Sequence, residues 1–281
     1  LDLLNDDGWD KAIKDCKYVM HIASPFPMKV SNDREKLLPV AVDGTLRVLN
    51  SSIKNNVEQI IVTSSIVAMF RKPNRSNPYT FGENDWTDEN WIEGVSDYFL
   101  SKTRAERIAW EFMESKGLKN KLTTINPGGV FGDALDKKGG TSIEYVRQFL
   151  KGKFPAAPKF AVLISDVKDV AKSHVACIGN KKVGGRRLII GKEVKKLVEL
   201  SQIMAEAMPE YAKKVPKKEL PNFMVKLISY IDSSAKTMIP DLGIMMQTDT
   251  TYAEDLLGFK FKGAKDCISE NAKSVVKLGL V

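Results

Sequence analysis

Three short stretches of the sequence carry side chains that could transfer a proton and hold a carbonyl oxygen. In chain order they are Thr63-Ser64-Ser65, Tyr98 with Lys102, and Asn126-Pro127-Gly128-Gly129-Val130. Residues four apart share one face of a helix, so Lys102 can lie beside Tyr98. A nearby ammonium favours tyrosinate, and we expect it to lower the pKa of Tyr98 from about 10 toward neutrality. Tyr98 could then give a proton to a developing alkoxide or take one from an alcohol.

Ser65 supplies the second hydroxyl that such a reaction needs. It can hydrogen-bond the substrate oxygen and hold it for hydride transfer, and Lys102 can also reach a cofactor ribose. Nicotinamide would supply the hydride. Each stretch alone has a simpler reading, because a Tyr/Lys pair is often exposed and paired serines often end a strand and cap a helix. Their order along the chain favours a hydride-transferring oxidoreductase.

The elements around these residues follow a strand–helix–strand rhythm. Apolar runs at 18–23, 59–64 and 122–126 read as strands, and helical patterns cover 33–55 and 97–116. This alternation predicts a doubly wound, Rossmann-like α/β fold with a parallel sheet and helices on both faces. Strands of such a sheet end at one rim, so the groups after Thr63 and near Asn126 should converge on one crevice.

After about Lys151 the strands and helices no longer alternate regularly. Helical patterns at 167–178 and 198–208, a strand at 187–190 and a loop at 215–221 suggest a smaller, more helical lobe. We therefore predict an incomplete dinucleotide-binding domain over residues 1–150. Residues 151–281 should form mainly a substrate-binding lobe, with some segments returning to the Rossmann sheet.

Composition restricts the class of protein further. The chain has 281 residues, 43% hydrophobic and 28% charged, so it can bury a hydrophobic core without disulfide bonds or structural metals. Three widely spaced cysteines indicate free thiols in a reducing compartment, and we expect a cytoplasmic location. The two histidines, His21 and His174, form no metal-ligand pattern, and we expect no metal site. Structural roles are favoured for both histidines.

The net charge of +8 is spread over scattered lysine pairs, without the aromatic interleaving of a nucleic-acid surface. We expect no nucleic-acid partner. The longest apolar stretch, Phe223 to Ile231, contains Lys226 and is too short to cross a bilayer, so no membrane association is expected. We therefore expect the protein to act on a small carbonyl compound, either as a monomer or as a homodimer.

The three chemical stretches together resemble a known family. Thr-Ser-Ser, Tyr-x-x-x-Lys and Pro-Gly-Gly-Val, in this order, are similar to the extended short-chain dehydrogenase/reductases of the NAD-dependent epimerase/dehydratase superfamily. Within them the chain most resembles the dihydroflavonol reductase-like and cinnamoyl-CoA reductase-like branch. Further shared pieces are Asp2-Leu-Leu4 with Gly8-Trp9, His21-Ile-Ala-Ser-Pro25, Val42-Asp-Gly-Thr45, Glu83-Asn-Asp-Trp86-Thr-Asp88, Asp166-Val-Lys-Asp169-Val-Ala171 and Leu256-Leu-Gly-Phe259.

The resemblance implies roles for individual residues. It makes Ser65, Tyr98 and Lys102 the catalytic residues and NADP, or NAD, the cofactor. The cofactor-binding residues it implies run from the adenine side to the nicotinamide side: Asp2, Leu3, Ala23, Ser24, Ser64, Tyr98, Lys102, Pro127 and Val130.

Three departures from the family pattern matter. The Gly-x-x-Gly-x-x-Gly turn that cradles the pyrophosphate is absent, and Gly128-Gly129 comes too late in the chain to replace it. With Leu1 as the first residue, we expect an N-terminal truncation, and we expect this chain alone to bind NAD(P)H poorly. Ala41 stands where many sugar-nucleotide epimerases have asparagine. Phe70 stands where plant dihydroflavonol reductases have a polar substrate contact.

The substrate is expected to be a compact aldehyde or ketone. Ile66-Val-Ala-Met-Phe70 and Phe26 offer apolar surface, and a hydroxyl-rich substrate would leave groups unpaired there. Phe26 and Phe70 are the predicted substrate contacts, although Phe70 could equally pack in the core. Two alternatives stay open: a sugar-nucleotide epimerase or dehydratase, and a catalytically silent protein that binds a nucleotide or a partner.

Overall fold

A four-stranded parallel sheet forms the centre of one half of the molecule. The structure, a computed structural model, describes residues 1–26, 31, 33–137 and 140–281. In it the strands lie in the order β1 (Tyr18–His21), β2 (Gln59–Thr63), β4 (Leu122–Pro127), β8 (Arg187–Ile190). All neighbouring strands are parallel, as the sequence predicts. Their carboxyl ends therefore lie on one rim of the sheet.

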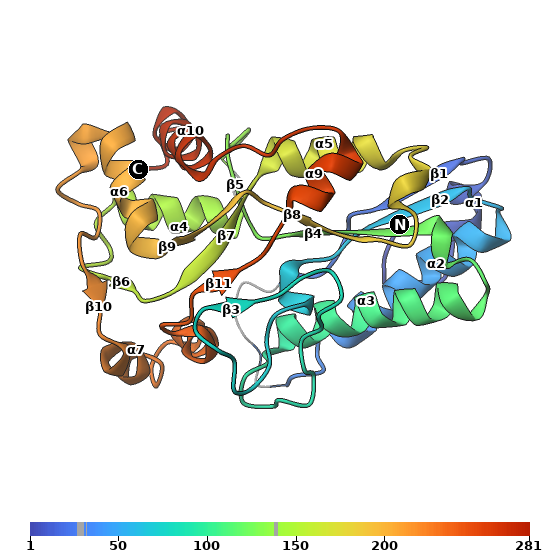
Figure 1. The fold of residues 1–281 in the computed structure, drawn as a ribbon, viewed down its shortest axis with the longest axis horizontal. Coiled ribbons are helices and arrows are strands. Elements are labelled where there is room, and N and C mark those ends of the chain that lie inside the picture. Colours follow the sequence, from blue (N-terminus) through green and yellow to red (C-terminus); the bar gives the residue numbers. More distant parts are fainter. Residues whose placement is uncertain (27–30, 32, 138–139) are drawn as a thin grey trace.

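Helices cover both faces of this sheet (Figure 1). On one face lie α2 (Gly44–Lys54) and α3 (Asp97–Ser115), and on the other lie α5 (Val167–Cys177) and α9 (Thr251–Leu257). Strand β2 shows the alternation that this arrangement requires. Ile60 and Val62 belong to the core cluster under α2 and α3, whereas Ile61 belongs to the cluster under α5 and α9. The predicted doubly wound fold is thus confirmed.

Most predicted boundaries differ from the observed ones by a few residues. The strand expected at 18–23 ends at His21, and the helix expected at 97–116 is α3. The helix expected at 33–55 begins later, as a π-helical stretch η1 (Pro39–Asp43) that continues into α2. Proline fits the first turn of a helix because the amide that it lacks would have no helical partner there.

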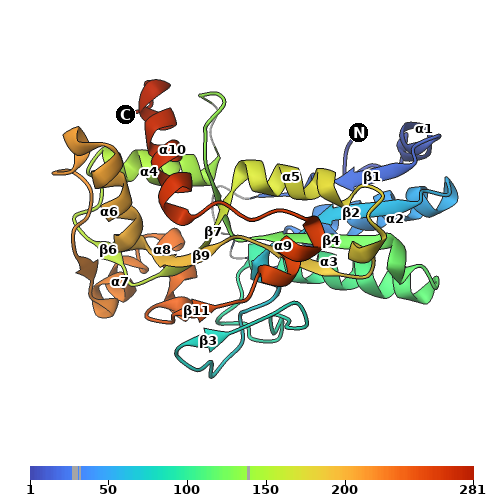
Figure 2. The same ribbon diagram turned by 45° about the horizontal axis from the view of Figure 1, so that its top comes forward.

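A second group of elements forms the other half of the molecule (Figure 2). Strands β5 (Gly129–Phe131), β7 (Ala161–Asp166) and β9 (Glu193–Lys196) make a mixed sheet in which β7 is central. Helices α4 (Thr141–Leu150), α6 (Leu197–Ala207) and α10 (Ala264–Lys277) share a buried cluster with this sheet. The chain crosses between the halves repeatedly, because β8 joins the first sheet and α9 packs on it. A division at residue 150 remains a prediction.

The other described elements are short. They are α1 (Trp9–Ile13), η2 (Ile66–Ala68), β3 (Tyr79–Thr80), η3 (Lys119–Lys121), β6 (Ala157–Pro158), η4 (Lys181–Val183), η5 (Pro209–Tyr211), β10 (Glu219–Leu220), α7 (Asn222–Ile228), α8 (Ser233–Met238), η6 (Ile239–Asp241) and β11 (Met246–Gln247). The loop expected at 215–221 contains β10, which pairs with β6. Among the described residues, no helix has both the length and the apolar character needed to cross a membrane.

Candidate active site

The predicted catalytic residues meet at the carboxyl rim of the first sheet. Ser64 and Ser65 follow β2 directly, and Pro127 ends β4, the neighbouring strand. Tyr98 lies in the first turn of α3, which Ser96 caps by accepting a hydrogen bond from the Phe99 amide at 3.5 Å. The convergence predicted from parallel strand order is therefore observed.

Ser65 and Tyr98 are joined by a side-chain hydrogen bond. Ser65 is 8% exposed, and its Oγ lies 3.4 Å from the Pro127 carbonyl and accepts from the Val67 amide at 3.3 Å. These contacts leave the Ser65 hydroxyl few orientations. The two hydroxyls thus form a preorganised pair that could hydrogen-bond one carbonyl oxygen.

The expected lowering of the Tyr98 pKa is not observed. Burial raises the pKa of Tyr98 to about 12, and the hydrogen bond from Ser65 offsets only part of this effect. The loss of solvent stabilisation for a phenolate is therefore the largest cause of the shift, and Lys102 is not among the groups that shift this pKa. Tyr98 is a neutral phenol near pH 7, which is the form that can donate a proton to a carbonyl oxygen.

Lys102 lies one helical turn after Tyr98 and is only 7% exposed. Burial lowers the pKa of Lys102 to about 8, opposed by the negative charge of Glu106. Burial, together with the Lys102 charge, lowers the pKa of His21, at the end of β1, to about 4. His21 is therefore a neutral core residue beside the site. No hydrogen bond joins its ring to any other described residue, although one was expected.

Lys102 also provides a test of whether the site fits a dinucleotide. In the described part of the chain, no side chain or carbonyl forms a hydrogen bond or ion pair with its ammonium. The ammonium has three N–H donors that no described residue takes up, so they are available to a bound ligand. A sugar diol at the rim would supply the missing acceptors. The residues present therefore fit the ribose of a nicotinamide cofactor.

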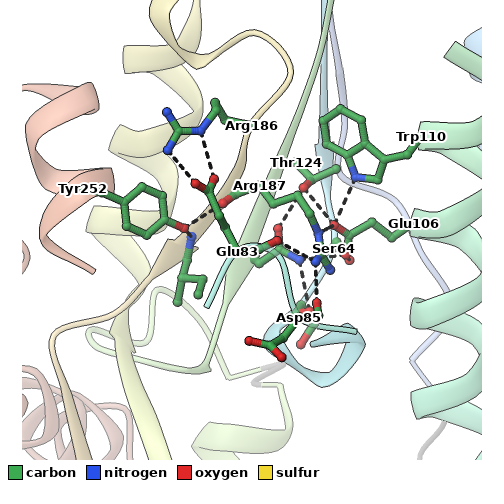
Figure 3. A network of polar contacts seen from close by, with 12 residues as sticks. Ser64, Glu83, Asp85, Glu106, Trp110, Thr124, Arg186, Arg187 and Tyr252 are labelled. Atoms are coloured by element: carbon green, nitrogen blue, oxygen red, sulfur yellow. Dashed lines mark hydrogen bonds and ion pairs between the residues drawn. The ribbon is translucent and has the colours of Figure 1, made fainter. Parts of the chain in front are cut away.

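Sequence reasoning missed the residue at the centre of the polar network, Glu106. Its carboxylate is buried between α3 and strands β2, β4 and β8 (Figure 3). The groups that donate to it are the Ser64 hydroxyl at 2.6 Å, the Asn126 amide at 2.8 Å, Arg187 Nε at 2.6 Å, the Thr124 hydroxyl at 3.0 Å and Trp110 Nε1 at 3.3 Å. Its spacing was the available signal, since Tyr98, Lys102 and Glu106 are four residues apart and share a helix face.

Burial acts to raise the pKa of Glu106, but Arg187 and the neutral donors outweigh it, so its pKa is lowered. The carboxylate is therefore ionised. Arg187 also donates to the carbonyls of Glu83 and Asp85 and stacks on Trp86. Next to it, Arg186 forms two hydrogen bonds with Glu83 (Figure 3). This network connects the catalytic helix to β8.

The predicted cofactor residues occupy different surroundings. Asp2 is exposed and accepts from the Leu4 amide, while the Leu3 carbonyl accepts from Arg47 at 2.7 Å. Ala23 is exposed and Ser24 half-buried in the segment after β1. Val130 is half-buried in β5. Of the predicted set, Ser64, Tyr98, Lys102 and Pro127 lie at the carboxyl rim or on the helix beside it, whereas Asp2 and Leu3 contact the N-terminal segment and Arg47, and Val130 pairs with Ser165 in the second sheet.

The two predicted substrate contacts also differ. The Phe26 ring packs edge-on against Tyr98, with ring centroids 4.8 Å apart, and remains 54% exposed. It therefore presents an apolar surface directly beside the proton donor. Phe70 is 2% exposed and packs against Phe81 and Phe99. This burial favours the packing role for Phe70.

His174 has the structural role predicted for it, and Asp166 also has a structural role. His174 bridges the Thr63 hydroxyl and the Val170 carbonyl at 2.7 Å each, which ties α5 to the end of β2. Asp166 caps α5 by accepting from the Lys168 amide at 2.8 Å. No cluster of the described residues could hold a metal ion.

A doubly wound parallel sheet with serine, tyrosine and lysine at its carboxyl rim defines an NAD(P)-dependent oxidoreductase of the short-chain type. The model of the 3-beta hydroxysteroid dehydrogenase/isomerase family matches residues 1–179. The chain belongs to this family.

Sequence and structural similarity to characterised reductases supports this assignment. The NADPH-dependent methylglyoxal reductase GRE2 of Saccharomyces cerevisiae is 31% identical, over 97% of this chain and 80% of its own length. Cinnamoyl-CoA reductase 1 of Petunia hybrida is 28% identical, over 99% and 76%. The crystal structure of yeast methylglyoxal/isovaleraldehyde reductase Gre2 complexed with NADPH superimposes with a TM-score of 0.79 at 28% identity, covering 100% of this chain and 84% of that one.

Proposed function

We propose that this protein reduces a compact aldehyde or ketone to the alcohol, with NADPH as hydride donor and Tyr98 as proton donor. The observation that carries the proposal is the hydrogen-bonded Ser65–Tyr98 pair, in which burial keeps Tyr98 protonated at neutral pH. The similar yeast methylglyoxal reductase is NADPH-dependent, and the resemblance implies that Pro127 and Val130 lie on the nicotinamide side of the cofactor.

The two hydroxyls would act on the same substrate atom. The Ser65 oxygen accepts from the Val67 amide, and its one O–H, which donates to the Pro127 carbonyl at 3.4 Å, would turn to donate to the substrate carbonyl oxygen and fix its position. Bound nicotinamide supplies the hydride to the carbonyl carbon. Tyr98 then donates its phenolic proton to that oxygen as negative charge develops on it. The Lys102 ammonium, one turn away on α3, stabilises the phenolate that remains.

Several residues would hold the cofactor. Lys102 would donate to a ribose hydroxyl, and Ser64 and Pro127 lie at the same rim. We assign Ala23 and Ser24 to the backbone along the cofactor, Asp2 and Leu3 to its adenine side, and Val130 to its nicotinamide side, as the family resemblance implies.

The substrate class follows from the surface beside Tyr98. Phe26 covers one side of the Tyr98 ring, and a hydroxyl-rich substrate placed there would lose hydrogen bonds to water at about 1–3 kcal/mol for each unpaired group. An alkyl or aryl group beside the carbonyl would pack on Phe26 instead.

We further propose that residues 151–281 supply the rest of the substrate site. The three free cysteines, of which Cys177 and Cys267 are buried, support a cytoplasmic location. We also propose that the protein is a monomer or a homodimer.

A panel of carbonyl compounds tests this proposal. Protein expressed from the complete coding sequence would be assayed with small aryl and alkyl aldehydes, a dihydroflavonol, a hydroxycinnamoyl thioester and a nucleotide sugar, by following NADPH oxidation. We expect the highest kcat/KM for the small carbonyls. A preference for the dihydroflavonol or the nucleotide sugar would contradict the proposed substrate class, and no turnover of any compound would contradict the activity.

A further inference from the structure

We propose that Glu106 is a positioning residue for this reaction, holding the Ser65 hydroxyl in place and maintaining the positive charge of Lys102. This inference rests on the proposed function. It concerns a carboxylate that no step of the chemistry uses directly, although it lies two helical turns from Tyr98 on the same helix. Figure 3 shows the carboxylate facing the ends of the central strands.

Glu106 reaches Ser65 by two routes. Its Oε2 accepts from the hydroxyl of Ser64, the residue directly before Ser65, at 2.6 Å. The same oxygen accepts from Asn126 Nδ2 at 2.8 Å, and that nitrogen also donates to the Ser65 carbonyl at 3.2 Å. Asn126 in turn precedes Pro127, whose carbonyl lies 3.4 Å from the Ser65 hydroxyl. One carboxylate therefore fixes the ends of both strands that position the serine.

Glu106 is also the charged group that opposes the burial of Lys102. Three titratable side chains affect or face Lys102: His21 from β1, and Tyr98 and Glu106 from α3. His21, with a pKa of about 4, and Tyr98, with a pKa of about 12, are both neutral at pH 7. Glu106 is ionised because Arg187 and four neutral donors stabilise its charge. The ammonium thus depends on this one carboxylate.

The direction of the pH effect follows from this arrangement. Lys102 is protonated below its pKa of about 8, so activity that needs the ammonium should be lost as the pH rises through about 8. Removing the Glu106 charge lowers the pKa of Lys102 further. Glu106 lies one helical turn after Lys102 on α3, and an opposite charge within about 4–6 Å shifts a pKa by about 1–3 units. The alkaline loss of activity should therefore occur at least about one pH unit lower without Glu106.

The test compares Glu106→Gln, which removes the charge and keeps the shape, with the wild type. Titration of the Lys102 side chain by ¹³C NMR, in protein without cofactor, should show a midpoint about one pH unit lower or more. In the reductase assay the alkaline limb of kcat should move down by the same amount. Glu83→Gln is the matched control, because Glu83 belongs to the same network but binds Arg186 and contacts neither Ser64 nor Lys102. Its Lys102 midpoint should stay unchanged.

Two further variants separate the two roles. Glu106→Asp keeps the charge but shortens the reach, so the Lys102 midpoint should remain near that of the wild type while kcat falls. Ser64→Ala removes one hydrogen bond and no charge, and it should lower kcat about tenfold without moving the midpoint. If Glu106→Gln does not fold, these two variants still test whether Glu106 positions Ser65. An unchanged midpoint in Glu106→Gln, or a Ser64→Ala enzyme of wild-type kcat, would overturn the inference.

The design also distinguishes the inference from the function on which it rests. A wild-type protein that reduces no carbonyl compound would contradict the proposed function, and the NMR midpoints would still test the effect of Glu106 on Lys102. An active wild type with equal midpoints and equal pH profiles in Glu106→Gln would contradict the inference alone.

Discussion

At the scale of single residues, burial sets the protonation states of Tyr98 and Lys102. A phenol with its pKa raised to about 12 holds its proton at neutral pH and can donate it. Lys102, with its pKa lowered to about 8, remains largely charged at pH 7 and can stabilise the phenolate after transfer. Both shifts have burial as their largest cause. The same exclusion of water that tunes these groups strengthens every hydrogen bond to the substrate oxygen.

We predict that Tyr98→Phe lowers kcat about 100- to 10,000-fold, which is the range that general acid catalysis supplies. The phenylalanine ring preserves the contact with Phe26 and removes only the transferable proton and the hydrogen bond with Ser65. The free energy of unfolding should change by only about 1 kcal/mol. NADPH oxidation and thermal unfolding measure the two quantities. A variant that kept most of its kcat would show that another group donates the proton.

At the scale of elements, the helices that flank the sheet are aligned by residues at their first turns. Asp166 ends β7 and caps α5, and its carboxylate also lies 3.2 Å from Lys262 Nζ. Asp169, one turn later, accepts from the Lys262 amide at 2.6 Å. His174 then joins the far end of α5 to Thr63, directly before Ser64 and Ser65. Helix α5 is therefore held at both ends, without any of these residues acting as an acid.

We predict that Asp166→Ala lowers the free energy of unfolding by about 1–2 kcal/mol, the usual cost of losing an N-cap. Because Asp166 caps a helix rather than moving a proton, kcat should stay within about twofold of the wild type. Denaturant unfolding and the reductase assay would be run together, with Asp7→Ala at an exposed position as the control. A large fall in kcat at unchanged stability would assign Asp166 to the chemistry instead.

At the scale of the whole molecule, the two sheets lie against each other just after Pro127. A Cβ atom on Gly128 would lie 2.2 Å from the Leu163 carbonyl oxygen in β7, so only glycine allows this contact. The contact places the mixed sheet next to the catalytic rim. A buried ion pair of Arg71 with Asp241 makes a second connection, between the segment after Ser65 and the C-terminal part of the chain.

We predict that Gly128→Ala destabilises the fold by about 1–3 kcal/mol, the usual cost of overpacking, and also reduces activity because β4 must shift at Pro127. Gly82→Ala is the matched control, since a Cβ there meets nothing within 4 Å. Thermal unfolding of the two variants provides the measurement. Equal melting temperatures would mean that the two sheets adjust freely at this contact.

The sequence by itself determined the class of this protein. The order of strands and helices was readable because apolar residues repeat with the periods of each element, and β8 was predicted over its observed residues, 187–190. The meeting of Ser65 with Tyr98 followed from parallel strand order and helical spacing, both of which are local rules. Boundaries such as the start of the 33–55 helix were less well predicted, because end residues depend on tertiary contacts.

Only the tertiary structure decided the electrostatics and the network behind the site. The sequence predicted a lowered pKa for Tyr98 from its neighbour Lys102, but burial, which no local pattern encodes, has the larger effect and reverses the direction. Likewise Glu106 and Arg187 are 81 positions apart in the chain and meet only because β8 returns to the sheet beside β4. Charges act through space and through the exclusion of water, so their effects become readable only when the distant segments are in place.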